Sequence, residues 1–338
     1  MKVLVLADPH IPVPPRTYGG TERIAALTCE ALVALGHEVA LVAGPGSRNY
    51  GGGVTIHRTP GPTLASRAWR RLIFHMITAH LSAGVELVIC HGRYDYLATV
   101  LARDVPLLLW MHNPVVQRDI DYVLARRARD VRFVGISQAQ VRGLTPAEKI
   151  EVVYNCVDTE RHAFGARPAV PPYLVFLGRL TPNKGVHLAI EAARRAGMRL
   201  IIGGNVTSEP GAREYFESQV RPRLGPDCTW IGPYDDRTKV DLLRGAAGLL
   251  FPIQWEEPFG LVMIEALACG TPVIALRRGS TPEVVRDGET GFLCAGVDEM
   301  VAAIARLPEL DRARCRQDVQ QRFSMDAFRT RLQQLIRG

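Results

Sequence analysis

Cysteine pairs are missing from this 338-residue sequence. Its seven cysteines, at positions 29, 90, 156, 228, 269, 294 and 315, are widely scattered and form no Cys-x-x-Cys motif. The number is odd, and several of them lie inside apolar segments, which argues against a disulfide scaffold and against a cysteine metal site. We expect buried, reduced thiols, as is typical of a cytoplasmic protein.

Long hydrophobic runs are missing too. No apolar run reaches the roughly 18 residues that span a bilayer. The segment 1–10 has only Lys2 before a short apolar run, and Asp8 and Pro9 then follow. This pattern predicts a first β-strand rather than a signal peptide, and a cytoplasmic location.

Lysine is scarce, and one region lacks acidic residues. Lys and Arg together number 41, but only four are lysines, and the net charge is +7. Residues 39–85 contain five Arg and no Asp or Glu, and within 66–80 basic and apolar residues alternate at helical spacing. Two interpretations remain, a solvated amphipathic helix or a peripheral contact with anionic lipid at the inner face of the membrane. Because the Arg residues are not interleaved with aromatics on one face, we expect no nucleic-acid partner.

Short apolar strands alternate with helical patterns along the whole chain, which indicates βαβ units and parallel sheets. Strands are predicted at residues 2–8, 38–44, 54–58, 86–92, 106–112, 132–137, 173–180, 198–204, 228–234, 248–253 and 272–276. The first helix is predicted over 21–36, with Thr21 as N-cap and Gly36 as its C-terminal stop. The pattern lapses at 159–172, which predicts a linker between an N-terminal domain, 1–158, and a C-terminal domain, 173–323.

Unusual loops follow several of the predicted strands, where open parallel sheets bind their ligands. The segment PPRTYGGTER, 14–23, contains Gly19 and Gly20 before a helix start, and a simple tight turn explains it equally well. FLGRLTPNKGVH, 176–187, places Arg179 and Lys184 near a helix N-terminus, where two cations could hold a diphosphate. His112 ends an otherwise apolar strand.

The segment EEPFGLVMIEALACGTPVIA, 256–275, carries two carboxylates around a Pro-Phe-Gly hinge. Pro258 and Gly260 make one unbroken helix through both carboxylates unlikely in energetic terms, so Glu257 is placed on a loop. The helix is predicted to start between Phe259 and Leu261. Glu265 then lies one turn inside it, beside N–H groups that attract anions.

Motifs for other chemistries are absent from the sequence. No P-loop, His-Glu-x-x-His or Gly-x-Ser-x-Gly occurs. The Asp-x-Asp segment 119–121 lies in a polar stretch rather than at the end of an apolar strand, so no metal site is predicted.

Together these segments resemble the retaining glycosyltransferases of family 4, which have the GT-B fold. The specific part is the Glu-x7-Glu segment from Glu257 to Glu265; YGGTER, GRLTPNKG and PEVVRDGETGFLC, 282–294, support it. The resemblance implies an α/β protein with two facing Rossmann-like domains, mostly parallel sheets and an interdomain cleft. It also implies that a last helix, 324–338, returns to the N-terminal domain. This chain has Cys156 where the family usually has glycine.

The resemblance also implies roles for individual residues. Glu265 would bind the ribose and Glu257 the donor sugar, while Arg179 and Lys184 would neutralise the leaving diphosphate. The remaining residues implied to bind the donor or face its sugar are Gly19, Gly20, His112, Tyr234, Phe259, Gly260 and Leu261.

The implied activity is metal-independent, retaining transfer of a hexose from a sugar nucleotide, with UDP-hexose ahead of GDP-mannose, to an acceptor hydroxyl. The sugar nucleotide is a co-substrate, and no cofactor is expected. The acceptor is left open among a lipid, a polysaccharide and a natural product. Two alternatives remain, a phosphorylase or epimerase of the same fold and a non-catalytic sugar-nucleotide-binding protein.

Overall fold

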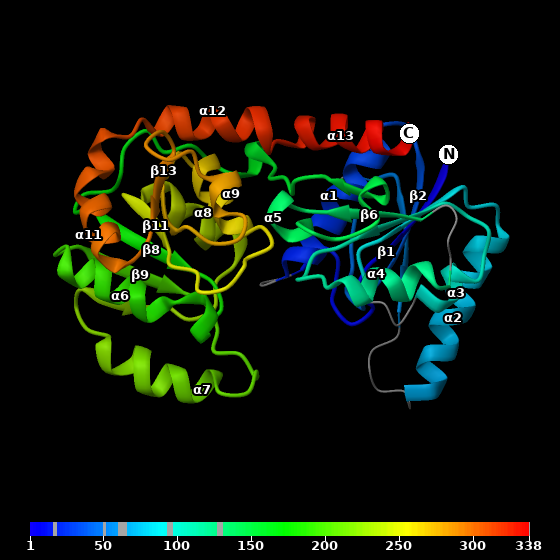
Figure 1. Cartoon of the computed structure of the whole chain (residues 1–338), viewed down its shortest axis with the longest axis horizontal. Helices are drawn as coiled ribbons and strands as arrows, with labels where there is room; N and C mark the ends of the chain where they lie inside the picture. Colours follow the sequence, from blue (N-terminus) through cyan, green and yellow to red (C-terminus); the bar gives the residue numbers. More distant parts are fainter. Residues whose placement is uncertain (16–18, 50–51, 60–65, 93–96, 127–130, 338) are drawn as a thin grey trace. The chain divides into compact units, whose positions relative to one another are not determined.

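The computed structural model describes residues 1–15, 19–49, 52–59, 66–92, 97–126 and 131–337, and it describes no side chains for 66–70 and 97–98 (Figure 1). The chain divides into two compact units. Unit 1 comprises residues 1–155 and 328–338, and unit 2 comprises 156–327.

Unit 1 is built on a parallel sheet, which has seven strands within the described residues, in the order β3-β2-β1-β4-β5-β6-β7. The strands are β1 (Lys2–Leu6), β2 (Glu38–Ala43), β3 (Val54–Arg58), β4 (Leu87–Cys90), β5 (Leu107–Trp110), β6 (Val131–Gly135) and β7 (Ile150–Val152). Its helices are α1 (Gly20–Ala34), α2 (Ser66–Ser82), α3 (Leu97–Leu101), α4 (Gln117–Leu124), α5 (Gln138–Val141) and, from residue 328, α13 (Met325–Arg337).

Unit 2 is built on a second parallel sheet, with six strands in the order β10-β9-β8-β11-β12-β13 within the described chain. The strands are β8 (Tyr173–Leu177), β9 (Arg199–Gly203), β10 (Cys228–Trp230), β11 (Gly248–Phe251), β12 (Val273–Leu276) and β13 (Gly291–Cys294). Its helices are α6 (Val186–Arg195), α7 (Ala212–Tyr215), α8 (Asp236–Gly245), α9 (Leu261–Ala268), α10 (Thr281–Val284), α11 (Val297–Arg306) and α12 (Arg312–Arg322).

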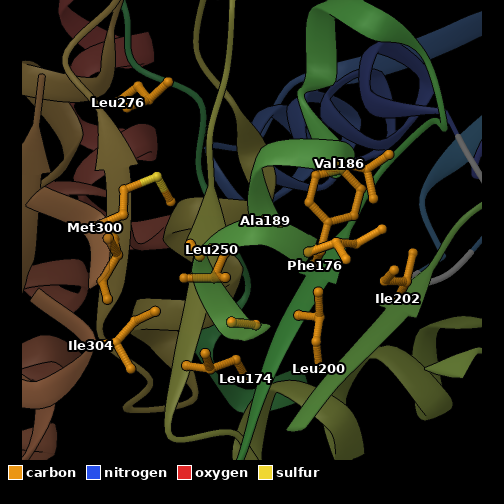
Figure 2. Packing of buried hydrophobic residues seen from close by; sticks show 14 of the residues in the cluster. Leu174, Phe176, Val186, Ala189, Leu200, Ile202, Leu250, Leu276, Met300 and Ile304 are labelled. Atoms are coloured by element: carbon orange, nitrogen blue, oxygen red, sulfur yellow. The ribbon is translucent and has the colours of Figure 1, made fainter. Parts of the chain in front are cut away.

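Both sheets confirm the predicted α/β class with parallel pairing. The strands read as near-continuous apolar runs because helices cover both faces of such sheets. In unit 2, side chains from β8, β9 and β11 meet those of α6 and α11 in one buried cluster, and Figure 2 shows Phe176, Leu250 and Ile304 within it. In unit 1 a matching cluster joins the central strands to Ile73 and Ile77 of α2.

Several sequence predictions need correction at element ends. Helix α1 begins at Gly20 with Gly19 as its N-cap and with no side-chain cap, so Thr21 is not the capping residue. Gly36 does end the helix region, with φ +82°, and its N–H bonds to the carbonyl of Val33. Strands β7 and β13 are short and were not predicted as strands.

The segment 159–172, predicted as a linker, falls in unit 2 and packs against it. The N–H of Gly165 bonds to the Cys269 carbonyl at 3.0 Å, and the N–H of Ala169 bonds to the Gly245 carbonyl at 2.8 Å. Backbone hydrogen bonds hold this stretch because its Pro and Gly residues form no regular element of their own.

Arg312 holds several segments of unit 2 together from the first turn of α12 (Figure 1). Its side chain is buried, and its guanidinium donates to the carbonyls of Gly165, Ala246 and Arg244 at 2.6, 2.7 and 2.8 Å and to the Thr271 hydroxyl at 2.9 Å. These groups lie at the C-terminal end of α8 or directly after it, precede β12, or lie in the 159–172 segment. A planar group with five donors suits such a divergent set of acceptors.

We expect Arg312→Ala to lower the free energy of unfolding by about 3 kcal/mol, because it leaves buried carbonyls without donors. Urea unfolding followed by circular dichroism measures this. The control is Arg314→Ala on the same helix, whose exposed ion pair with Glu289 should contribute under about 1 kcal/mol. Equal losses in the two variants would contradict the role given to Arg312.

Candidate functional site

The carboxyl ends of parallel strands lie along one edge of each sheet, so the loops that follow them are neighbours. In unit 2, Arg179 and Lys184 follow β8, Tyr234 follows β10 and Glu257 follows β11. Because β11 pairs directly with β8, the loop of Lys184 and the loop of Glu257 are adjacent although 73 residues separate the two side chains.

Gly185 lets these two loops meet. Its φ is +71°, and a Cβ atom on it would lie 2.0 Å from the carbonyl oxygen of Pro252, so no larger residue fits. The loops are then joined by hydrogen bonds from the backbone N–H of Gln254 to Asn183 at 2.9 Å and from its side chain to the Pro182 carbonyl at 3.0 Å. This approach brings Lys184 within reach of Glu257.

Lys184 and Glu257 form an ion pair between Nζ and Oε2, with only 12% and 10% of their side chains exposed. The same carboxylate oxygen accepts a hydrogen bond of 2.8 Å from the indole N–H of Trp255. The Lys184 ammonium also lies 5.2 Å from the centre of the Trp255 ring, which adds a cation–π contact. Three side chains thus form one polar cluster at the sheet edge.

The turn after β12 closes on the other side of Glu257. A Cβ on Gly279, which has φ +53°, would lie 2.4 Å from the backbone nitrogen of Glu257. The N–H of Ser280 bonds to the Glu257 carbonyl at 3.0 Å, and the Glu256 carboxylate accepts from the Gly279 N–H at 2.8 Å. Glu257 is therefore held by backbone contacts from the turn after β12 and by the Lys184 side chain from the loop after β8.

Glu265 lies in α9 and pairs with Lys239 of α8. The Nζ–Oε1 distance is 2.6 Å, and both side chains are buried, with 6% and 8% exposed. Lys239 also lies 3.2 Å from Asp236. A buried carboxylate without a cation would be costly, so Lys239 balances the charge of Glu265 and fixes its position.

Arg179 pairs with Glu209, which lies in the loop after β9. Since β8 lies between β9 and β11, the two predicted phosphate-binding cations are paired on opposite sides of their strand. Lys184 is brought to Glu257, and Arg179 to Glu209. A hollow of about 580 Å³ lies beside this pair, lined by the 206–209 loop, α7 and Trp230.

The other predicted donor residues of unit 2 take three positions. The Tyr234 ring packs on Gly203, where a Cβ would meet it at 2.7 Å. Phe259 is 1% exposed and contacts the Phe323 ring, so its side chain belongs to the core. Gly260 is the N-cap of α9 with φ +79°, and Leu261 is the first helical residue, within the predicted range.

In unit 1, His112 follows β5 as predicted and contacts His91, which follows β4. His112 Nε2 lies 2.8 Å from His91 Nδ1, and the rings are stacked with centroids 5.1 Å apart. The Trp110 ring stacks on His91, also at 5.1 Å. Burial lowers the pKa of His112 to about 3 and that of His91 well below its ordinary value, with the neighbouring imidazole as a second cause for His91.

The glycine pair lies at the N-terminus of α1, with Gly19 at φ +158° and Gly20 as the first helical residue. A Cβ on Gly19 would meet Pro15 at 2.7 Å and the Glu22 carboxylate at 2.9 Å, so this turn is tightly packed. Residues 16–18 of the same predicted loop lie outside the described residues.

Four residues that make these contacts were not predicted from the sequence: Lys239, Trp255, Glu209 and His91. Lysine scarcity was a usable signal, since two of the four lysines, Lys184 and Lys239, each pair with one of the two glutamates. Glu209 and His91 gave no signal, because their partners are distant in sequence, and Trp255 was overlooked although it lies only two residues before Glu257. Among the described residues, no group of three or more His, Cys, Asp and Glu could hold a metal ion. No described helix has both the length and the apolar character to cross a bilayer.

Two family models match the chain. The model described as Glycosyltransferase Family 4 matches residues 18–161, and the model described as Glycosyl transferases group 1 matches residues 158–322. The first match falls mainly on unit 1 and the second on unit 2.

Similar curated proteins are glycosyltransferases from mycobacteria. A D-inositol 3-phosphate glycosyltransferase of Mycobacterium marinum is 35% identical over 171 residues, which cover 46% of this chain and 36% of that protein. A glycogen synthase of Mycobacterium tuberculosis is 36% identical over 171 residues, covering 48% of this chain and 40% of that protein. The matches thus span well under half the length of these relatives.

Solved structures show the same fold over the whole chain. AviGT4, a glycosyltransferase involved in avilamycin A biosynthesis, has a TM-score of 0.72 at 24% identity and covers 100% of this chain and 97% of its own. Anabaena HepE, solved in complex with UDP and glucose, has a TM-score of 0.75 at 18% identity and covers 100% of both chains. Two glycosyltransferase family models thus match residues 18–161 and 158–322, and the fold of the whole chain is that of GT-B glycosyltransferase structures.

Proposed function

We propose that this protein transfers a hexose, with retention and without a metal, from a sugar nucleotide to an acceptor hydroxyl. The observation that carries the proposal is the polar cluster of unit 2, where Lys184 meets Glu257 while Lys239 holds Glu265 in the helix that follows. UDP-hexose is the favoured donor and GDP-mannose the next. The structure of HepE with UDP-glucose supports a uridine nucleotide for this fold.

In unit 2 the two glutamates have different tasks in this proposal. Glu265 accepts hydrogen bonds from the ribose hydroxyls, and its carboxylate is held in position by the 2.6 Å contact with Lys239. Glu257 accepts from hydroxyls of the sugar. The backbone N–H groups at Phe259, Gly260 and Leu261, at the start of α9, orient sugar and phosphate because a helix N-terminus attracts anions.

The two cations stabilise the leaving group. As the bond from the anomeric carbon to the phosphate oxygen breaks, negative charge collects on the diphosphate, and Arg179 and Lys184 neutralise it. Their carboxylate partners, Glu209 and Glu257, keep them in place before the diphosphate arrives. Lys184 has three donors, so it can bind the phosphate and still contact Glu257.

The transfer itself is proposed to occur on one face of the sugar. The acceptor oxygen bonds to the anomeric carbon of an oxocarbenium-like state, and its proton passes to the departing phosphate oxygen. Glu257 is occupied with sugar hydroxyls and is given no nucleophilic role. In unit 1, Gly19 and Gly20 contribute N–H groups to the anion, His112 contacts the sugar, and in unit 2 Tyr234 lies beside the nucleotide.

Calorimetry of the full chain with UDP, GDP and ADP in the presence of EDTA tests the donor site. We expect one nucleotide, UDP first, to bind with micromolar affinity. Glu265→Gln keeps the shape of the side chain but makes it a weaker hydrogen-bond acceptor for the ribose hydroxyls. The affinity for the nucleotide should therefore fall about tenfold or more. Glu289→Gln, at an exposed ion pair of the same unit, should change nothing. Failure of all three nucleotides to bind, or full affinity in Glu265→Gln, would refute the assignment.

We also propose peripheral contact with anionic membrane at the cytoplasmic face through α2. Within the 39–85 region, α2 has two exposed apolar side chains, Leu72 and Phe74, with exposed fractions of 40% and 49%. Arg71, next to Leu72, is exposed as well. Exposed apolar and basic groups on one helix suit a headgroup surface. The side chains of Arg67 and Arg70 lie outside the described residues.

Flotation with anionic and with neutral vesicles tests this contact. The protein should float with anionic vesicles only, and the double variant Leu72→Ser, Phe74→Ser should lose most of that binding. Val170→Ser, at the 95% exposed Val170 of unit 2, is the matched control and should float like the parent. Equal absence of binding to both vesicle types would rule the contact out.

A further inference from the structure

His91 is a buried polar residue that the proposed reaction does not use. It is 2% exposed, at the carboxyl end of β4, and its backbone N–H bonds to the Leu6 carbonyl at 2.8 Å. Its ring lies against both Trp110 and His112, each with centroids 5.1 Å away and with interplanar angles of 22° and 26°. The two stacked rings restrict rotation of the His91 side chain. His91 contacts the ring of His112 through one hydrogen bond.

That contact carries a single proton. His91 Nδ1 and His112 Nε2 are 2.8 Å apart, so one of them donates and the other accepts. Burial disfavours the charged form of both rings and lowers both pKa values, so each ring is neutral at neutral pH and has one N–H. Two arrangements are then open, and they give His112 opposite chemistry at its other nitrogen, Nδ1.

The far nitrogen of His91 decides between the two arrangements. His91 Nε2 is buried and has no hydrogen-bond partner among the described residues. If His112 donated, this Nε2 would carry a buried N–H without an acceptor. If His91 donates from Nδ1, Nε2 is a bare lone pair, and a buried donor without a partner is the rarer and costlier defect.

Trp110 strengthens this preference. Its indole N–H is likewise buried without a partner among the described residues, and the ring stacks on His91. Indole nitrogen can only donate. With His91 Nε2 unprotonated, the stacked pair of rings has one unsatisfied buried N–H instead of two.

We propose that His91 is a positioning residue that donates from Nδ1 to His112 Nε2 and thereby fixes the proton of His112 on Nδ1. His112 then presents a neutral N–H donor to an oxygen of the donor sugar and does not act as a base. The part that concerns the sugar rests on the proposed function, since it takes His112 as a sugar contact. The assignment of the two protons stands on the geometry of unit 1 alone.

The assignment predicts a specificity. A sugar that places a hydroxyl or carboxylate oxygen against His112 gains a hydrogen bond, and a deoxy sugar at that position leaves a half-buried N–H without an acceptor. Loss of such a bond costs about tenfold in affinity. The affinity for a nucleotide without sugar should not depend on which nitrogen of His112 carries the proton.

Long-range ¹H–¹⁵N spectra of the full chain with ¹⁵N-labelled histidine test the proton positions directly. We expect both His91 and His112 to carry the proton on Nδ1, with the resonances assigned by their loss in His91→Phe and in His112→Gln. A His112 proton found on Nε2, or an average over both nitrogens, would overturn the proposal. This experiment needs no nucleotide, so it is decided even if the proposed function fails.

Affinities for UDP-glucose and UDP test the consequence. His91→Phe keeps the stacked ring but removes the donor, so it should weaken UDP-glucose about tenfold and leave UDP unchanged. His91→Asn, whose amide can donate near the same position, should recover part of the loss. His80→Phe replaces another half-buried histidine of unit 1, which contacts His57, and should match the parent. Equal loss of affinity for UDP and for UDP-glucose in His91→Phe would show that His91 has a structural role only. If the parent protein did not bind UDP at all, the proposed donor would be refuted instead.

Discussion

The polar cluster of unit 2 depends on backbone approaches that only glycine permits. Gly185 lets the loop after β8 touch the carbonyl of Pro252 in the loop after β11, and Gly279 lets the turn after β12 touch the backbone of Glu257. A side chain at either position would clash with backbone atoms of the neighbouring loop. Both residues also have positive φ, a backbone conformation that is strained for any residue with a side chain. These two approaches place Lys184 against Glu257 and hold the carboxylate between two loops. A site held in this way is organised before a substrate binds, which lowers the cost of binding it.

Charge compensation is the second theme of unit 2. Each glutamate of the Glu-x7-Glu segment is nearly buried and has a lysine partner, Lys184 for Glu257 and Lys239 for Glu265. Buried charges without partners are unstable, so these lysines are as necessary to the site as the carboxylates. The buried Arg312 is stabilised by neutral acceptors, because its guanidinium donates hydrogen bonds to carbonyl and hydroxyl oxygens.

Parallel pairing makes the site predictable to a useful extent. Eleven strands could be placed from apolar runs, and a parallel sheet gathers whatever follows its strands along one edge. Arg179 and His112 were therefore expected at strand ends, and each lies just past the last residue of its strand. One error has a local cause: Thr21 is not the cap of α1, because the glycine pair leads the chain into the helix. The linker role of 159–172 stays a prediction, and this segment packs on unit 2 through backbone hydrogen bonds that no side-chain pattern reveals.

The sequence by itself determined the α/β class, most strand positions, the start of α9 and the resemblance to glycosyltransferases, because periodicity, proline and glycine act locally. Tertiary structure alone decided the partners. Lys239 with Glu265, Lys184 with Glu257 and Glu209 with Arg179 are contacts set by strand order, loop approach and helix packing. The contact of His91 with His112 is of the same kind, since the two histidines are 21 residues apart and follow two neighbouring strands. Which nitrogen of a histidine holds a proton follows from what surrounds it, and the chain supplies those surroundings only once it is folded.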